Sequence, residues 1–562
     1  MKHTLYKYII GVIITVAAWL FWWLGHPELI SFHEQNQLFL FTSEYLTERL
    51  SIAGGFADYI SEFLVQFFFY IGTGAAIIGM VLAVMQLLLC TVIKKQHENW
   101  NVLPLLIAVI VTLLMWAHLM DENAMLSYPI AIILSLSTYL LCRRGGWILQ
   151  LFASLPLYWL VGPAFVVQVA LAMIDAWKDK KWAQALVANV LLAGVAAGWI
   201  YTCRTLWVAQ YPWNTVLAGI NYHRLTLMMC EAPQSQYDVL FYLLIMYGGS
   251  MLMQLMKKIS LFRQHGHIWK HAAVCWVIMV SLLPLKHAFD ENYHHDINTH
   301  VLLEQQYLVR KGDWNGIIAK AEVYNAQQIP ALNSPLSANA INLALVKTQQ
   351  MSTRMFEFPQ SGIQGLIMPN VRDNVSNVIS MEAFWELGFV NEALRYAFDS
   401  QESIPNCRKS GRFMRRMAEC NIVNGNYLVA SKYIDLLKQS LFYSDWAKQA
   451  ETYLYQEEKI ALHPEWSQKR QLRLDEDFLY YWPELHKMIG KLVLHNRQNQ
   501  MAFNYFMASL LLKGDFQSFV ANLPQQPKQG EDPFPKGYRE YVAYMQAHQG
   551  QADAITSATV NK

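Results

Sequence analysis

The chain has 562 residues, of which 54% are hydrophobic and only 15% are charged, and its formal net charge is +2. This composition is too apolar for an ordinary soluble protein and too polar for a pure membrane bundle. A small net charge with interspersed signs gives no basic surface for nucleic acid, which is therefore excluded as an expected partner. The composition indicates a chain of two parts, and we expect the boundary at residue 289.

Lysine and arginine are unevenly distributed in the first part, residues 1–288, where short loops separate a series of apolar runs. If Met1–Tyr8 is cytoplasmic, the inner segments hold thirteen basic residues: Lys2, Lys7, Lys94, Lys95, Arg143, Arg144, Lys178, Lys180, Lys181, Lys257, Lys258, Arg263 and Lys270. The outer segments hold four: Arg49, Arg204, Arg224 and Lys286. This asymmetry predicts a multi-pass membrane protein with a cytoplasmic N-terminus and with residues 289–562 outside.

The apolar runs have about the 17–25 residues that a helix needs to cross the bilayer. The expected spans are Ile9–Leu24, Phe63–Ile93, Val102–His118, Leu126–Cys142, Ala183–Cys203, Val239–Met256 and Ala272–Lys286. A further run, Trp147–Ala176, is interrupted by Pro156 and by Gly162-Pro163, so it forms either two short crossings or a re-entrant hairpin. Counted as two crossings, it gives about nine crossings in all.

The first outer loop has the most distinctive local sequence. A polar cluster, His33 to Gln37, precedes the segment Leu38–Leu50, in which apolar residues recur at roughly helical spacing. That spacing predicts a helix lying on the outer leaflet. A turn containing Gly54 and Gly55 follows, and then the long second span begins.

This order of parts resembles the first outer loop of multi-pass glycosyltransferases of the GT-C type, which use lipid-phosphate sugar donors. The resemblance implies that Glu34 is the acid of the first loop and that Asp121 and Glu122 are further acids in the second. One carboxylate would deprotonate an acceptor hydroxyl, and others would hold Mg²⁺ or Mn²⁺ against the donor phosphate. Gln35 stands where that family often has a second acid. In the alternative interpretation, Glu34 is a solvated loop residue and the acidic pair merely ends two spans.

The second part, residues 289–562, carries 27 Lys and Arg against 29 Asp and Glu and has helical periodicity throughout. A pattern of two helices joined by a short turn recurs, with the turns at Gly312, Gly388, Gly425 and Gly514. We expect each glycine to end a helix in the left-handed conformation. The first two intervals, 76 and 37 residues, suggest a period near 37 residues with one unit hidden after Gly312, whereas the last, 89 residues, does not fit this period. The units resemble degenerate tetratricopeptide repeats.

The predicted fold is therefore all-α: a polytopic helical bundle followed by a repeat domain with a surface suited to a protein or peptide partner. Cys407 and Cys420 either pair in an oxidising compartment or stay as free thiols. The whole chain resembles a group of uncharacterised bacterial envelope proteins. Two functions are expected from these observations: a cell-envelope scaffold or assembly factor, and alternatively a glycosyltransferase that uses a lipid-linked sugar.

Overall fold

The computed structural model describes residues 2–96, 102–179, 182–224, 236–245, 277, 281, 297–371, 373–406, 408–476, 478, 480–523 and 536–543. Helices form this part of the chain and no β-strand occurs in it, although an isolated antiparallel bridge pairs Ala124 with His223. The chain divides into two compact units. Unit 1 contains Met1–Asp296 with the short segment Gln439–Phe442, and unit 2 contains Ile297–Lys438 with Tyr443–Lys562. The all-helical prediction is confirmed for the described residues.

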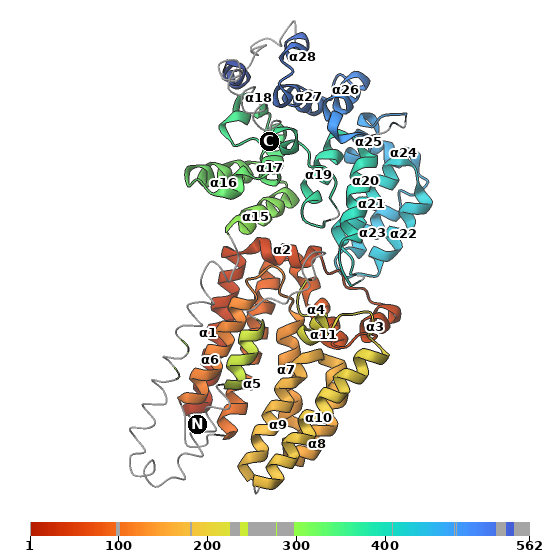
Figure 1. Ribbon diagram of the computed structural model, residues 1–562. Coiled ribbons are helices and arrows are strands. Elements are labelled where there is room, and N and C mark those ends of the chain that lie inside the picture. Colours follow the sequence, from red (N-terminus) through yellow and green to blue (C-terminus); the bar gives the residue numbers. More distant parts are fainter. Residues whose placement is uncertain are drawn as a thin grey trace, which may run out of the picture. The chain divides into compact units, whose positions relative to one another are not determined.

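Unit 1 is a bundle of long helices with short helices at one end (Figure 1). The long helices are α1 (Lys2–Leu20), α5 (Ile71–Gln96), α6 (Leu103–His118), α7 (Ser127–Cys142), α8 (Gly146–Val161), α9 (Phe165–Asp179) and α10 (Trp182–Leu206). The short helices are α2 (Pro27–Gln35), α3 (Ser43–Leu50), α4 (Gly55–Val65) and α11 (Trp213–Ala218). Single turns of other helix types connect them: η1 (Phe21–Gly25), η2 (Gln66–Phe69), η3 (Arg143–Gly145) and η4 (Gly162–Ala164).

Four stretches of unit 1 are long and apolar enough to cross a membrane: Tyr6–Gly25, Ile71–Lys94, Ser127–Trp177 and Trp182–Leu206. Leu103–His118 and Gln236–Ile245 are shorter apolar helices. The expected span Ala272–Lys286, except for Val277 and Ser281, and the second half of Val239–Met256 lie outside the described residues. These stretches identify the chain as a membrane protein.

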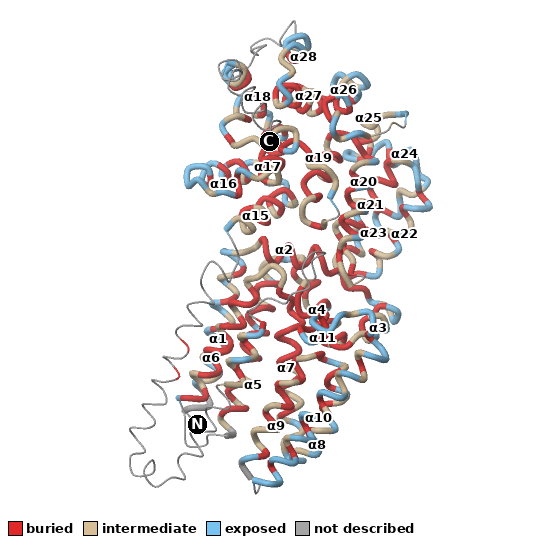
Figure 2. Tube along the Cα trace, in the orientation of Figure 1, coloured by how far each residue is buried: buried red, intermediate tan, exposed pale blue. Residues whose placement is uncertain are grey.

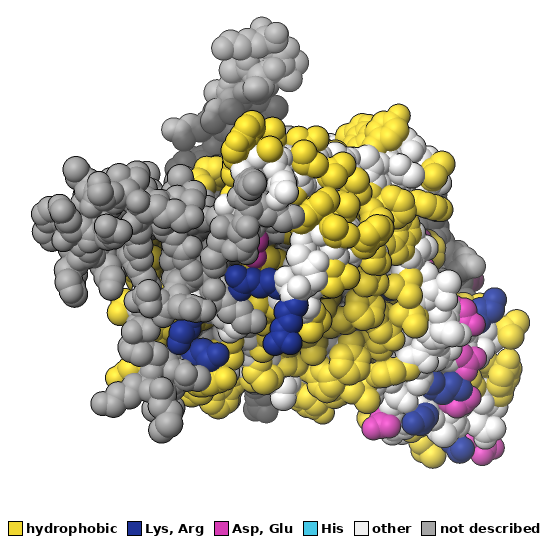
Figure 3. Space-filling model, turned by 90° about the horizontal axis from the view of Figure 1, so that it is seen from below, with side chains coloured by type: hydrophobic (Ala, Val, Ile, Leu, Met, Phe, Trp, Pro, Cys, Tyr) yellow, Lys and Arg dark blue, Asp and Glu magenta, His cyan; other side chains and the backbone are white. Residues whose placement is uncertain are grey.

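The exposed surface of the helices in unit 1 is largely apolar, as contact with lipid requires. Large hydrophobic side chains of α10 are exposed, among them Trp182, Val190 and Tyr201, while the side of this helix that contains Ala188 and Leu192 is buried (Figure 2). Hydrophobic side chains also cover much of the described surface in Figure 3, with lysine and arginine gathered in a few groups between them. In water, so large an apolar surface would be an aggregation hazard.

The predicted single long helix over Phe63–Ile93 is wrong. The chain leaves helical geometry at Tyr70 (φ −104°, ψ 111°), between η2 and α5. The Thr73 hydroxyl lies 2.7 Å from the carbonyl oxygens of both Phe67 and Tyr70, so its single proton is shared between two acceptors at the break. The apolar helix of this expected span therefore begins at Ile71, and the residues before Tyr70 belong to the end of the unit that contains the short helices.

The ambiguous run Trp147–Ala176 forms two helices, α8 of 16 residues and α9 of 15, which pack against each other. The chain reverses at Gly162, whose φ of +73° lies in the left-handed region. Both helices also pack against α7 and α10, so the hairpin is an integral part of the bundle.

Unit 2 is built from consecutive helices that pack mainly on their neighbours in sequence (Figure 1). Its first half contains α15 (Ile297–Lys311), α16 (Trp314–Ala326), α17 (Pro335–Lys347), α18 (Met351–Arg354), α19 (Asn377–Leu387), α20 (Val390–Glu402), α21 (Gly411–Asn424) and α22 (Tyr427–Lys438). Its second half contains α23 (Ser444–Glu451), α24 (Glu457–Leu462), α25 (Pro464–Leu472), α26 (Leu485–His495), α27 (Gln500–Lys513) and α28 (Phe516–Ala521). Short 3₁₀ turns are η5 (Pro330–Asn333), η6 (Met355–Glu357), η7 (Gly362–Gly365) and η8 (Trp482–Glu484).

Each of the four predicted glycine turns is confirmed. Gly312, Gly388, Gly425 and Gly514 have φ values of +68°, +101°, +78° and +79° and follow the last residues of α15, α19, α21 and α27. The next helix begins two residues later in every case, and the two helices of each pair are in contact. Glycine adopts this conformation at little steric cost, which is why it marks these turns.

A further left-handed turn lies between Gly312 and Gly388, at Gln349. Gln349 has φ +59° and follows α17, 37 residues after Gly312 and 39 before Gly388. The amide of the following residue, Gln350, donates to the carbonyl of Leu345 at 2.7 Å, as the amide of Asp313 does to Leu308 at 3.0 Å. The same cap therefore occurs at 312, 349, 388 and 425, and also at Gln328 and Gly514.

Candidate functional site

Glu34, the predicted acid of the first outer loop, lies in a helix. Pro27 occupies the first turn of α2, where its missing N–H costs nothing, and residues 28–35 of this helix are buried. Glu34 itself is only 4% exposed. The alternative in which Glu34 is a solvated loop residue is therefore wrong, because α2 packs against η2 and α5.

The acidic pair Asp121 and Glu122 lies in the turn between α6 and α7, as the sequence predicted. Asn123 organises this turn: its backbone amide donates to Asp121 Oδ1 at 2.8 Å, and its side chain donates to Glu122 Oε1 at 3.0 Å. Burial raises the pKa of both carboxyl groups, and for Glu122 the neighbouring charge of Asp121 adds to the effect. The Arg224 guanidinium partly opposes both shifts.

Arg224 connects this turn with α2, and sequence reasoning missed it. Its backbone amide donates to the carbonyl of Asn123 at 2.7 Å, and its Nε donates to Asn123 Oδ1 at 3.2 Å. Its guanidinium lies 4.9 Å from the ring centroid of Phe32 in α2. Burial lowers the pKa of the neighbouring His33 to about 4, and the positive charge of Arg224 contributes to that shift. Arg224 is one of the four basic residues in the segments that the sequence predicts to lie outside, and this was the available sequence signal.

The structure thus brings the turn between α6 and α7 and the segment around His223 together with α2. Met125 donates its backbone amide to the carbonyl of Tyr222 at 2.9 Å, beside the Ala124–His223 bridge. Asp121 and Glu122 are neighbours here, whereas the three predicted acids do not form a compact ligand cluster in the described part of the chain. Carboxylates are suitable ligands for Mg²⁺ or Mn²⁺, but burial that favours protonation works against binding. A metal shared between Glu34 and the acidic pair stays a prediction.

The predicted interfacial helix begins later than expected, at Ser43 instead of Leu38. The Thr42 side chain caps α3 by accepting a hydrogen bond from the backbone amide of Tyr45 at 3.1 Å. Residues 36–42 before the cap form no helix. The helix therefore has 8 residues, five fewer than the predicted segment Leu38–Leu50.

A buried ion pair fixes α3 onto α4. Arg49 Nε donates to Glu62 Oε2 at 2.7 Å, and the side chains of these residues are 4% and 0% exposed. The hydroxyl of Tyr45 also donates to Glu62 and lies 3.4 Å from the Arg49 guanidinium. This cluster ties α3 to α4.

The Gly54-Gly55 turn lets the loop approach the α8–α9 hairpin. Gly54, at φ +90°, donates its amide to the carbonyl of Trp159 at 2.9 Å, and a Cβ on it would lie 3.5 Å from the Gly162 backbone. A Cβ on Gly55 would lie 1.7 Å from the carbonyl oxygen of Arg49, so no other residue type fits without rearrangement.

Unit 2 contains a pocket of about 330 Å³ beside two successive helix turns. The turn at Gly388 and the turn around Gly425 form two walls, and the segment after α25 forms the third. The lining residues are Gly388, Phe389, Val390, Asn391, Glu392, Asn424, Asn426, Arg473, Leu474, Asp475, Glu476 and Phe478. Sequence analysis did not find this pocket, because its third wall comes from a distant irregular segment.

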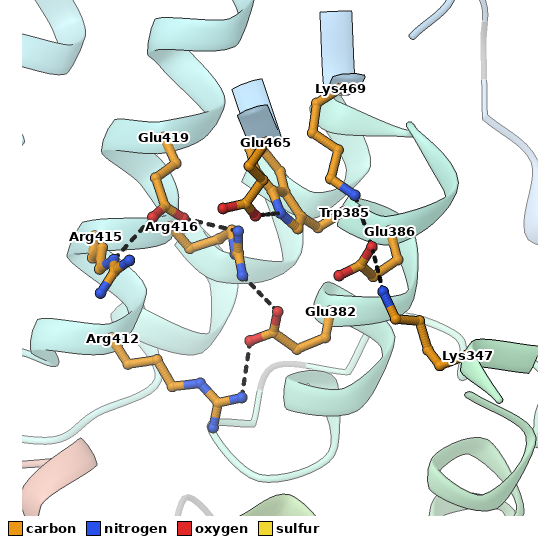
Figure 4. Close-up of polar contacts among 10 residues, drawn as sticks. All are labelled: Lys347, Glu382, Trp385, Glu386, Arg412, Arg415, Arg416, Glu419, Glu465 and Lys469. Carbon is orange, nitrogen blue, oxygen red and sulfur yellow. Dashed lines mark hydrogen bonds and ion pairs between the residues drawn. The ribbon is translucent and has the colours of Figure 1, made fainter. Parts of the chain in front are cut away.

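A dense network of ion pairs joins the interior of unit 2 (Figure 4). Glu382 of α19 accepts from Arg412 at 2.9 Å and from Arg416 at 2.6 Å, both on α21. Burial alone would raise the pKa of Glu382, but the two guanidinium groups hold it at about 2. Arg416 also donates to Glu419 at 2.8 Å, and its guanidinium lies 4.4 Å from the Trp385 ring centroid.

The network extends from α19 to two more helices. Glu386 pairs with Lys469 of α25 at 2.7 Å and with Lys347 of α17 at 3.1 Å. Trp385 Nε1 donates to Glu465 at 2.7 Å. All of these charges have partners, so the network serves to join four helices. Cys420, on α21 in the same region, is a buried free cysteine, and Cys407 lies outside the described residues.

Comparison with known proteins identifies a family for the whole chain. The model of a family of unknown function, DUF6057, matches residues 2–562. No curated protein and no solved structure matches the chain. Because the match covers both units, the protein belongs to the family of unknown function DUF6057.

Proposed function

We propose that this protein is a scaffold or assembly factor of the bacterial cell envelope, which holds a protein or peptide partner outside the inner membrane. The thirteen-to-four distribution of basic residues supports a cytoplasmic N-terminus and an outer position for unit 2. The seven long helices of unit 1 and the two expected spans near Val239–Met256 and Ala272–Lys286 would make about nine crossings.

The recurrent cap of unit 2 is the observation that supports a binding function. Left-handed turns at Gly312, Gln349, Gly388 and Gly425 recur every 37–39 residues, the spacing of degenerate tetratricopeptide-like units. Helices of successive units are in contact, as α17 is with α19 and α20 with α21. Stacked helix pairs present an extended surface whose ordinary use is to bind another chain.

Photo-crosslinking in living cells tests this proposal. A photoreactive amino acid is placed at Asn391 or Asn426, beside the turns, and at Glu402 or Asp435, near the opposite ends of the same two helices. We expect a discrete adduct with one partner from the turn positions and none from the control positions. Correctly inserted protein that gives no adduct from exposed positions anywhere on unit 2 would contradict the binding function.

Glycosyl transfer is the second candidate, favoured by the burial of Glu34. A carboxylate that is 4% exposed at the outer end of a membrane bundle costs free energy and is often kept for function. In this alternative Glu34 activates the acceptor hydroxyl, Asp121 and Glu122 hold the divalent metal, and a lipid-phosphate sugar is the donor. Glu34→Gln should then abolish transfer to acceptors in isolated membranes while insertion and folding persist. Unchanged transfer would remove this candidate.

A further inference from the structure

We propose that the pocket beside the Gly388 and Gly425 turns binds a lysine or arginine side chain of an extended peptide. This inference rests on the proposed binding function and names the chemistry that the partner presents. The pocket, at about 330 Å³, is large enough for one long side chain with its flanking peptide groups.

Amide groups line the wall formed by the two turns. The Asn424 side chain donates to Asn391 Oδ1 at 2.8 Å, and Arg473 donates to Asn424 Oδ1 at 3.2 Å and to the carbonyl of Val423 at 3.0 Å. Asn426 adds a third, exposed amide. An amide side chain offers both a donor and an acceptor, which matches the N–H and C=O groups of a peptide backbone.

The charge of the lining favours a cationic ligand. Among the described lining residues, Glu392, Asp475 and Glu476 are acidic and Arg473 is basic. Glu392 Oε2 is buried, accepts no hydrogen bond from the described residues, and lies 3.7 Å from the Arg395 guanidinium. This long ion pair leaves the Glu392 carboxylate, which lines the pocket, incompletely compensated, and an entering ammonium or guanidinium group would add a second counter-charge.

The apolar part of the lining completes the match. Phe389, Val390, Leu474 and Phe478 lie beside the polar groups in the same pocket. Lysine and arginine carry a methylene stem that packs on apolar surface while the charged end reaches polar partners. A short amine or a metal ion would leave this apolar part of the pocket unfilled.

Calorimetric titration of the full-length protein in lipid nanodiscs tests the proposal. The probes are the blocked peptide Ac-Ala-Lys-Ala-Ala-NH₂ and the same peptide with norleucine in place of lysine. We expect the lysine peptide to bind at least about tenfold more tightly than the norleucine peptide. Glu392→Gln should remove this preference, whereas Glu402→Gln, the same change at the other end of α20, should retain it.

Three results would overturn the assignment. Equal binding of the two peptides, or an undiminished lysine preference in folded Glu392→Gln protein, would show that the pocket does not select a cation. Failure of both peptides to bind folded wild-type protein would also overturn it. If unit 2 binds a partner by other chemistry, the crosslinks expected at Asn391 and Asn426 would still form when the peptide titration gives any of these results. The two experiments therefore test the two proposals independently.

Discussion

Gln349 and Gly312 occupy equivalent turns, 37 residues apart, and both have left-handed backbone conformations. Glycine pays almost no steric cost there, but glutamine pays roughly 1–2 kcal/mol because its Cβ approaches the following carbonyl oxygen. The cap at Gln349 is nevertheless formed: the backbone amide of the next residue, Gln350, donates to the carbonyl of Leu345. Packing of α17 between α15, α16 and α19 accounts for a turn that the local sequence disfavours.

This relationship predicts opposite effects of two substitutions. Gly425→Val should destabilise unit 2 by about 1 kcal/mol or more, and the cost is a backbone effect because no atom lies within 4 Å of a Cβ at this position. Gln349→Gly should stabilise it by up to about 1 kcal/mol, after the greater freedom of glycine in the unfolded chain is subtracted. Denaturant unfolding of the full-length protein measures both. A neutral Gly425→Val variant would contradict the cap.

The second prediction concerns the buried pair Arg49–Glu62. Replacing Glu62 by Gln leaves the Arg49 guanidinium buried without its counter-charge and should cost about 3–5 kcal/mol. Thermal unfolding in detergent, together with proteolysis of the first outer loop, measures the loss. Replacing both residues by apolar ones of similar volume should recover much of the stability. A single variant as stable as wild type would show that water reaches the pair.

The third prediction is a pH dependence that originates at Glu382. The two guanidinium groups lower the pKa of this carboxyl from 4.5 to about 2 in the folded protein. The stabilisation is therefore complete above pH 4.5 and is lost as the pH falls toward 2. Denaturant unfolding of wild type and Glu382→Gln at pH 7, 4.5 and 3 isolates it, because the difference between them should shrink with acidification. A difference that is constant across this range would exclude the ion pairs as its source.

The fourth prediction is the topology. A periplasmic reporter fused after Lys562 should be active, and a cytoplasmic reporter fused before Met1 should be active as well. Cysteines introduced between Lys94 and Trp100 should resist membrane-impermeant reagents added from outside. A C-terminal fusion that reports a cytoplasmic location would overturn the assignment.

Sequence patterns predicted elements whose signal is local. Gly388 and Gly425 marked their turns because few other residues accept positive φ, and α6 lies within one residue of its expected bounds. The burial of α2 could not be predicted, because polar residues such as His33 and Glu34 ordinarily indicate exposure. Thr42 was an available signal for the start of α3, but apolar spacing before it suggested an earlier one.

The candidate sites depend on contacts between distant segments, which periodicity does not report. Arg224 meets Asn123 across 101 residues, and Arg473 meets Asn424 across 49. The sequence singled out Asp121 and Glu122 from their position at the ends of spans, whereas the residue that organises them, Asn123, carries no charge.

The ion pairs around Glu382 also constrain how relatives of this protein can diverge. Losing Glu382 alone leaves Arg412 and Arg416 facing each other away from water, and losing one arginine unbalances the remainder. Substitutions at these positions are therefore tolerated only when they occur together, because a chain in which only one of the three residues is replaced folds poorly. Positions 382, 412 and 416 should consequently vary as a set across the family, with relatives carrying either all three charges or an apolar replacement of the whole group.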